Sequence, residues 1–439
     1  MAGEAAAGSL PHDLTEATRK LTEGVFDDYV EWTAKPEIKL PNWGEAVMFV
    51  TILFGGMILT RRRDFSIFGR NRRKGGGYKS ILDRSPSSSS LDEEFEFDSG
   101  NEDDENAWQS SSEYLYGPEK QVPKTRTCCG LWQISTPNTS RFQNHIHSRL
   151  FQKFPFLVEM LYWVLNYLFY RMTTILSNKI FAGQGIWTAA QSHAITLLSF
   201  EHLSIFRFLF LIRELDIQQW FMHGHQDLLT FLDRFYSLIH IPGSMAFIVW
   251  YYYVAPSHAT FATVRRTMTL TNFMAFATFT VYPMMPPRLL PKEFGFLDTV
   301  HMESAASLWQ TGKHVNSLAA MPSMHFGYSF VIGSTLIYHS GVFRRRFEKF
   351  ESRKNMFWKV FYCVLGLGYP SMILITILAT ANHYWMDAFV AFVYCLIAFA
   401  CNKVFYVFLP LEDWFLWCIR ADKPKPSTGE RYHARGGKI

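Results

Sequence analysis

The sequence predicts an all-α, polytopic integral membrane protein. Of its 439 residues, 49% are hydrophobic and 17% aromatic. Several apolar runs approach or exceed the ~20 residues that a membrane-spanning helix needs. Clusters of Lys and Arg recur between these runs, as they do in cytoplasmic loops. A very polar stretch over 61–150 offsets the apolar remainder, so that the mean hydropathy is close to zero.

The N-terminal third is expected to contain one membrane helix between two polar segments. Residues 1–42 are polar and are expected to be loosely ordered. Residues 43–60 predict a transmembrane or interfacial helix, because their uncharged core is shorter than a full span. Residues 61–153 predict a disordered cytosolic linker, since their Gly, Ser and acidic runs lack the apolar content needed to fold.

Residues 154–410 are predicted to form the membrane domain, and residues 411–439 a basic C-terminal tail. Apolar runs predict six helices, at 154–176, 235–257, 267–287, 315–342, 360–382 and 388–409. The segment 185–234 mixes apolar and charged residues, which favours an amphipathic helix lying in the membrane interface over a span.

Two short polar stretches at the ends of apolar runs contain the candidate chemistry. Pro322 suits the first turn of a helix, Ser323 follows it, and His325 lies about one turn in. The free N–H groups of such a turn form an anion site. His383 and Asp387 are four residues apart, so on a helix they share a face. Two imidazoles, a carboxylate and N–H donors together can hold a phosphate, attack it and protonate a leaving group.

These residues resemble motifs of the PAP2 (phosphatidic acid phosphatase type 2) superfamily. Pro322-Ser323-Met324-His325 is similar to its Pro-Ser-x-His motif, His383 to Asp387 to its His-x-x-x-Asp motif, and 282–291 to its upstream Arg-Pro motif. The continuation 296–299 looks most like the inositolphosphotransferase branch, which includes the fungal inositol phosphorylceramide synthases. The resemblance covers about 185–405 and implies a six-helix core, to which this chain adds an N-terminal membrane helix.

The resemblance implies a role for each matching residue. His383 is expected to take the phosphoryl group, and Asp387 to orient it. His325 is expected to protonate the leaving oxygen and later to deprotonate the incoming alcohol. The predicted phosphate-binding residues are Arg288, Ser323 and Lys313. No metal or other cofactor is expected. His193, Glu201, His240 and Asp298 are expected either to contact substrate or to make structural hydrogen bonds.

The chain departs from the superfamily pattern at two cationic positions. Val281 stands where the superfamily has Lys, and Thr376-Ile377 stands where it has Ser-Arg. Lys313, His314 and Lys292 are candidate replacements. These departures count against a simple phosphatase more than against the transferase branch.

The expected activity is an inositolphosphotransferase that moves inositol phosphate from phosphatidylinositol to a ceramide-like alcohol. A lipid phosphate phosphatase is the alternative enzyme, and a transporter or scaffold that reuses the fold is the non-enzymatic alternative. Phospholipid and sphingolipid-like substrates and the bilayer are the expected partners. The modest net charge of +5 excludes nucleic acid as a likely class of partner, and protein partners stay open.

The basic clusters also predict an orientation. They lie at 265–266, 344–359 and 423–438. If all of them face the cytosol, alternating spans place the motif residues at the lumenal face and the loop 61–153 and the C-terminus in the cytosol. The expected location is an endomembrane, Golgi or ER.

Overall fold

The computed structural model describes residues 42–63, 65–68, 123–128, 132–183, 185–202, 212–236, 240–299, 316–343, 355–430 and 432. The chain divides into two compact units. The first contains Val158–Val404 with Met1–Leu59 and Thr428–Ile439, and the second contains Thr60–Leu157 with Phe405–Ser427. The predicted polar segment 1–42 lies outside the described residues, apart from its last residue.

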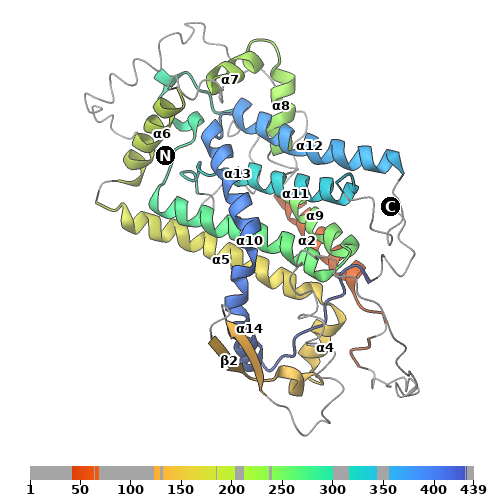
Figure 1. Ribbon diagram of the computed structural model, residues 1–439. Coiled ribbons are helices and arrows are strands. Elements are labelled where there is room, and N and C mark those ends of the chain that lie inside the picture. Colours follow the sequence, from red (N-terminus) through yellow and green to blue (C-terminus); the bar gives the residue numbers. More distant parts are fainter. Residues whose placement is uncertain are drawn as a thin grey trace, which may run out of the picture. The chain divides into compact units, whose positions relative to one another are not determined.

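The first unit is helical (Figure 1). Its helices are α2 (Asn42–Thr60), α5 (Phe156–Ile180), α6 (Ile186–Glu201), α7 (Glu214–Met222), α8 (Gln226–Arg234), α9 (His240–Val254), α10 (His258–Val281), α11 (Met324–Ser340), α12 (Met356–Ala379) and α13 (Trp385–Ala400). The 3-10 turns η4 (Pro287–Leu289) and η5 (Lys292–Phe294) follow α10. The single interfacial helix predicted over 185–234 is therefore wrong, because three separate helices occupy the described part of that segment.

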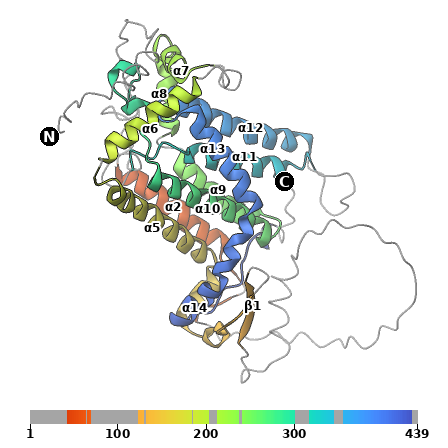
Figure 2. The ribbon, with the colours of Figure 1, turned by 60° about the vertical axis from the view of Figure 1, so that its left-hand side comes forward.

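Two glycines bring α11 and α12 into close contact, and the two helices run side by side in Figures 1 and 2. Gly333 of α11 faces Gly366 and Pro370 of α12, and a Cβ at Gly333 would lie 2.6 Å from the Pro370 Cγ. A Cβ at Gly366 would lie 2.7 Å from the Gly333 carbonyl oxygen. Only a residue without a side chain allows the backbones to approach this closely.

A buried ion pair links α5 to α10, which lie alongside each other in Figures 1 and 2. Arg265 donates to the Glu159 carboxylate at 2.6 Å, and its guanidinium lies over the Tyr162 ring at 4.8 Å. The pairing satisfies two charges that would each be costly to bury alone. Helix α13 packs across α10.

Backbone hydrogen bonds bring three connecting segments together at one end of these helices. Met284 and Ala319 form a parallel bridge, in which Met284 N–H donates to Leu318 O at 2.8 Å. Arg288 N–H donates to Ala381 O at 2.9 Å. The segment after α10, the segment before α11 and the α12–α13 connection are thus held side by side, although they are far apart in the sequence.

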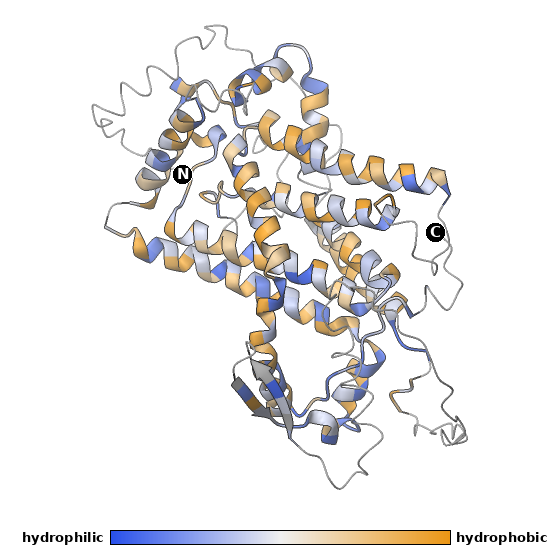
Figure 3. Ribbon diagram, viewed as in Figure 1, coloured by the Kyte–Doolittle hydropathy of each residue, from blue (hydrophilic) through white to orange (hydrophobic). Residues whose placement is uncertain are grey.

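Hydropathy identifies α12 as a helix long and apolar enough to cross a membrane (Figure 3). The run 385–418 meets the same criteria only if α13 and the helical segments after it count as one broken span, and Ala46–Thr60 is apolar but shorter. The remaining predicted spans carry charged or polar residues or are shorter. That other helices besides α12 cross a membrane therefore stays a prediction.

The second unit corrects two expectations. It contains an antiparallel hairpin of β1 (Lys124–Cys128) and β2 (Trp132–Thr136), then η1 (Thr139–Phe142), α4 (Ile146–Lys153), the end of η6 (Asn402–Phe408) and α14 (Leu409–Cys418). The prediction of a disordered linker is wrong for residues 124–128 and 132–153, and the all-α class is incomplete because the structure contains this hairpin. The predicted tail boundary at 411 is wrong as well, since it falls inside α14.

Long-range contacts explain why local composition misled these predictions. Asp413 of α14 accepts from Arg126 Nε of β1 at 2.6 Å and from Thr136 Oγ1 at 2.9 Å. A partner 287 residues away thus supplies the charge that pairs with Arg126 in this polar segment. Residues 69–122 lie outside the described part of the chain.

Candidate active site

The start of α11 places His325 at the site. Ser323 is the N-cap, and its hydroxyl oxygen accepts from Phe326 N–H at 3.3 Å. The Met321–Pro322 peptide bond is cis. Because Ser323 is the cap, Pro322 lies just before it, whereas the sequence predicted Pro322 in the first helical turn. The helix begins at Met324, so His325 is its second residue and lies at the exposed N–H end of the helix.

The start of α13 positions the second histidine. His383 lies in the turn between α12 and α13, so it is not on the helix with Asp387 as expected. The two residues still meet, because Asp387 Oδ2 accepts from Tyr384 N–H at 2.9 Å and lies 3.2 Å from His383 Nδ1. Asp387 thus both caps α13 and contacts the imidazole, and it is completely buried.

The partners of His383 fix its tautomer. Its Nδ1 atom lies 2.7 Å from the carbonyl oxygen of Ala320. A carbonyl oxygen only accepts hydrogen bonds, so Nδ1 must carry the proton. The lone pair is then on Nε2, which no hydrogen-bond donor among the described residues engages. His383 is consequently held as a neutral imidazole with Nε2 free to act as a nucleophile.

Burial reinforces this protonation state. The pKa of His383 is lowered to about 4, chiefly because burial disfavours the charged ring, with a further lowering by the Arg288 guanidinium. The hydrogen bond to Ala320 acts in the opposite direction but does not outweigh burial. At neutral pH the ring is therefore uncharged.

His325 lies between two aromatic partners and faces His383. Its Nδ1 atom is 3.3 Å from the Tyr236 hydroxyl, and the two rings are 4.2 Å apart between centroids. The His240 ring lies 4.9 Å away, and Tyr369 in turn holds His240 Nδ1 at 2.8 Å. The centroids of His325 and His383 are 5.7 Å apart. The structure thus brings the two predicted histidines together.

Arg288 is held beside the histidines, and one of its N–H groups makes no hydrogen bond among the described residues. Its Nε donates to Asn382 Oδ1 at 2.7 Å, and Asn382 donates to Thr380 Oγ1 at 2.6 Å. Its Nη1 atom is buried, makes no hydrogen bond among the described residues, and lies 3.8 Å from Asp298 Oδ2. A buried guanidinium N–H without a hydrogen bond is a place where an anion's oxygen can bind.

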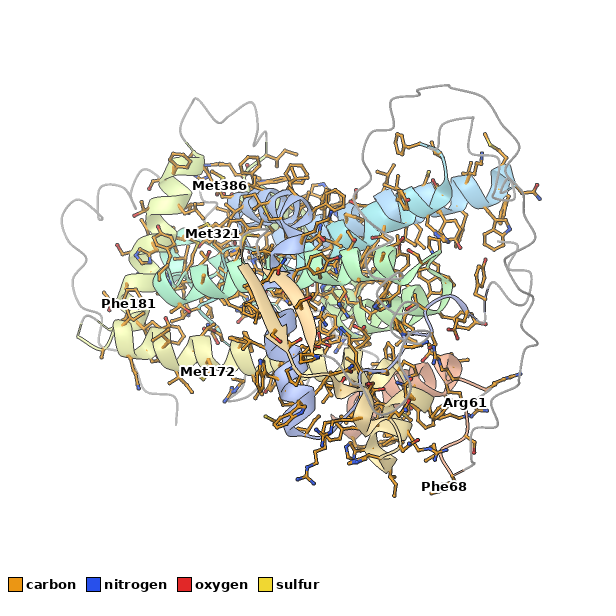
Figure 4. All side chains as sticks on the ribbon, turned by 60° about the horizontal axis from the view of Figure 1, so that its bottom comes forward. Arg61, Phe68, Met172, Phe181, Met321 and Met386 are labelled. Carbon is orange, nitrogen blue, oxygen red and sulfur yellow. The ribbon has the colours of Figure 1, made fainter. Side chains whose placement is uncertain are left out.

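Two further carboxylates hold the first turn of α13. Glu201, at the end of α6, accepts from Met386 N–H at 2.6 Å. Glu214, at the start of α7, accepts from Trp385 N–H at 3.2 Å. With Asp387, they engage three successive N–H groups that would otherwise be unpaired at a buried helix end. Figure 4 shows Met386 near Met321, which precedes Pro322, so the two motif segments are neighbours.

The other predicted residues have mixed outcomes. Ser323 caps α11, is completely buried, and its N–H donates to Asp387 O at 3.0 Å, so a phosphate contact by Ser323 stays a prediction.

Lys313 and His314 lie outside the described residues. Lys292 is exposed in η5, and the structure gives it no contact with the site. His193 stacks on Tyr282 and bonds Pro283 O at 2.8 Å, which is a structural role.

The sequence motifs do not mark Tyr236, and they give Asn382 and Glu214 no individual role. Asn382 directly precedes His383, so its position next to a candidate nucleophile was a usable signal. Tyr236 and Glu214 belong to helices that only tertiary packing brings to the site. No local pattern could have marked them.

The geometry supports transfer of a phosphoryl group. It offers a neutral nucleophilic imidazole, a second imidazole nearby for proton transfer, a carboxylate that stabilises positive charge on the first ring, and a guanidinium for the phosphate oxygens. Among the described residues, no group of three or more His, Cys, Asp or Glu side chains is arranged to hold a metal ion.

Comparison with known proteins agrees with this chemistry. A family model described as the PAP2 superfamily matches residues 201–347. No curated protein and no solved structure matches the chain significantly. The family match contains His325 and Arg288 but ends before His383, and it covers about a third of the chain. It indicates phosphatase or phosphotransferase chemistry and does not distinguish between the two.

Proposed function

We propose that this protein is a membrane lipid phosphotransferase that works through a phosphohistidine on His383. One observation carries the proposal: the carbonyl oxygen of Ala320 fixes the proton on His383 Nδ1 and leaves Nε2 without a hydrogen-bond partner among the described residues. The centroids of the His383 and His325 rings are 5.7 Å apart. A hydrogen bond of this kind suits a nucleophilic imidazole, since it holds the single proton of the neutral ring on Nδ1 and leaves the lone pair on Nε2.

The proposed reaction has two halves. In the first, His383 Nε2 attacks the phosphorus, the bond from phosphorus to the lipid oxygen breaks, and His325 gives that oxygen a proton. In the second, His325 takes a proton from the acceptor alcohol, the alcohol oxygen attacks the phosphorus, and the bond to His383 breaks. While the phosphoryl group is on Nε2, the Nδ1 proton makes the ring cationic, and Asp387 offsets this charge.

The cations of the site favour a phosphodiester as the donor. A diester phosphate carries one negative charge, whereas a monoester carries close to two at neutral pH. Val281 and Ile377 supply no charge where the superfamily has cations, and among the described residues Arg288 is the cation beside the histidines. This balance supports the inositolphosphotransferase branch: inositol phosphate would move from phosphatidylinositol to a ceramide-like alcohol, with diacylglycerol as the leaving group.

The proposed setting is an endomembrane of the Golgi or ER. There the motif residues would face the lumen, and the basic clusters and the C-terminus would face the cytosol. The apolar helix α12 and the superfamily match support membrane association. Protease protection of tags placed at the C-terminus and in the loop 61–153 of sealed vesicles tests this orientation.

A headgroup-transfer assay tests the activity. Purified full-length protein receives phosphatidylinositol labelled in the inositol, with or without ceramide. We expect the label to move to a new lipid only when ceramide is present. Release of water-soluble inositol phosphate independent of ceramide would show a hydrolase instead. Equal activity in His383→Ala protein would exclude the catalytic assignment, whereas loss of activity at intact expression would exclude the transporter or scaffold alternative.

A further inference from the structure

We propose that Tyr236 is the positioning residue that makes His325 the proton carrier of the site, by holding its Nδ1 atom so that the proton for the lipid leaving group travels through Nε2. This inference rests on the proposed phosphotransfer by His383. It assigns a role to a residue of the α8–α9 connection that neither the sequence motifs nor the family match identifies.

The contact is direct and isolated. The Tyr236 hydroxyl lies 3.3 Å from His325 Nδ1 and has no other hydrogen-bond partner among the described residues. Tyr236 is 7% exposed, and its ring lies against the imidazole at 4.2 Å between centroids. On another side, the His240 ring lies 4.9 Å from the His325 ring, and Tyr369 fixes His240 through a hydrogen bond of 2.8 Å. His325 therefore has little freedom to rotate.

The two histidines differ in the chemical group that contacts their Nδ1 atoms. The partners of His383 Nδ1 are a carbonyl and a carboxylate oxygen, which accept from an N–H and so keep the proton on Nδ1. The partner of His325 Nδ1 is a hydroxyl, which both donates and accepts. It donates to the neutral ring and accepts from the imidazolium, so neither charge state of His325 loses its hydrogen bond. The partners of His383 thus suit one arrangement of protons, whereas the hydroxyl beside His325 suits both charge states that the proposed proton transfer requires.

The cycle balances over one turnover. The His325 imidazolium gives its Nε2 proton to the lipid oxygen as the bond from that oxygen to phosphorus breaks. In the second half, Nε2 takes the proton of the acceptor alcohol as the alcohol oxygen bonds to phosphorus. Throughout, the Tyr236 hydroxyl contacts Nδ1 and keeps Nε2 directed at the reacting oxygens. Without it, the imidazolium keeps its contacts with the neighbouring rings but loses the acceptor for its second N–H.

Leaving-group dependence tests this role, because only a poor leaving group needs a proton. We would measure first-turnover release from two esters of the same phosphoinositol group, one of diacylglycerol and one of p-nitrophenol. In Tyr236→Phe, release of diacylglycerol should fall about 10- to 100-fold, which is part of the contribution of general acid catalysis. Release of p-nitrophenolate should change less than about threefold, since this anion leaves without protonation.

Two further variants make the result decisive. Tyr328→Phe removes a hydroxyl on the same helix as His325 that bonds Asn272 instead, and it should affect both esters equally. If the melting temperature of Tyr236→Phe shows that the variant is poorly folded, 3-fluorotyrosine at position 236 replaces it as the test. This residue keeps the ring and weakens the oxygen as an acceptor. It should give a smaller loss, again confined to the diacylglycerol ester.

The outcomes separate this inference from the function on which it rests. Equal losses for the two esters in a folded Tyr236→Phe protein overturn the role of Tyr236 and leave the proposed function standing. Failure of wild-type protein to release either product overturns the proposed function and the inference together. If the wild type instead acts on the monoester pair phosphatidate and p-nitrophenyl phosphate, the same comparison on that pair decides the role of Tyr236.

Discussion

The backbone N–H of Ser323 donates to the carbonyl oxygen of Asp387 at 3.0 Å and joins the start of α11 to the start of α13. Each of these helix starts adjoins one of the two candidate histidines. A hydrogen bond between the two starts therefore fixes the separation of His325 and His383 through the backbone. The site depends on such connections more than on any one side chain, and the predictions below follow from them.

Asn382 should matter to catalysis through Arg288. It accepts from Arg288 Nε at 2.7 Å, so Asn382→Ala releases the guanidinium from its fixed position. Arg288→Lys removes the Nε donor and the planar fork. We expect both variants to lower kcat/KM for the phosphodiester substrate about 10- to 100-fold, as for loss of one positioned donor. Lys292→Met, which removes an exposed cation four residues beyond Arg288, should change it less than twofold. Comparable losses in all three would argue against a specific phosphate contact.

Glu201 should make the protein less stable as pH rises. Burial, and next the neighbouring Glu214, raise the pKa of Glu201 well above its ordinary value. The folded state then binds more protons than the unfolded state at pH values above about 4.5, so stability falls as pH increases through that range. Glu201→Gln keeps an acceptor for Met386 N–H and removes the titration. Melting temperatures between pH 5 and 8 should decline less in this variant. An unchanged slope would contradict the prediction.

Gly333→Ala should separate α11 from α12. The added methyl group would overlap the Gly366 carbonyl oxygen and the Pro370 ring, which are backbone and rigid atoms that cannot yield. Overpacking of this kind costs about 1–3 kcal/mol. Gly368→Ala is the matched control, because nothing lies within 4 Å of a Cβ at that position. Thermal unfolding in detergent should show a lower melting temperature for Gly333→Ala alone. Similar melting temperatures would mean that the helices pack less closely than described.

The ion pair of the second unit should be worth far more than an exposed one. Arg126→Ala leaves Asp413 buried without its cation, and breaking a buried pair costs about 3–5 kcal/mol. Arg213→Ala breaks the exposed pair with Asp216, and such pairs contribute about 0–1 kcal/mol. Limited proteolysis of residues 123–157 should accelerate in the first variant only. If both variants resist proteolysis like the wild type, Arg126 does not hold the hairpin to α14.

Sequence patterns predicted the helical class, the approximate positions of α5 and α9–α13, and the two histidine motifs. They succeeded where the determining information is local: apolar runs, and His383 four residues before Asp387. They failed where it is distant. The order in residues 132–153 depends on Asp413, and the environment of His325 depends on Tyr236 and His240. Even the His383–Asp387 contact arises through a helix cap and not through the shared helix face that the spacing suggested.

Trapping of the phosphoenzyme tests the central claim most directly. Protein mixed with the p-nitrophenyl ester of labelled phosphoinositol would be quenched in alkali, which preserves phosphohistidine, and mapped by peptide mass spectrometry. We expect the label on His383, and more of it in His325→Ala, since that variant lacks the base for the second half-reaction. Label on another residue, or turnover by His383→Ala protein, would contradict the account.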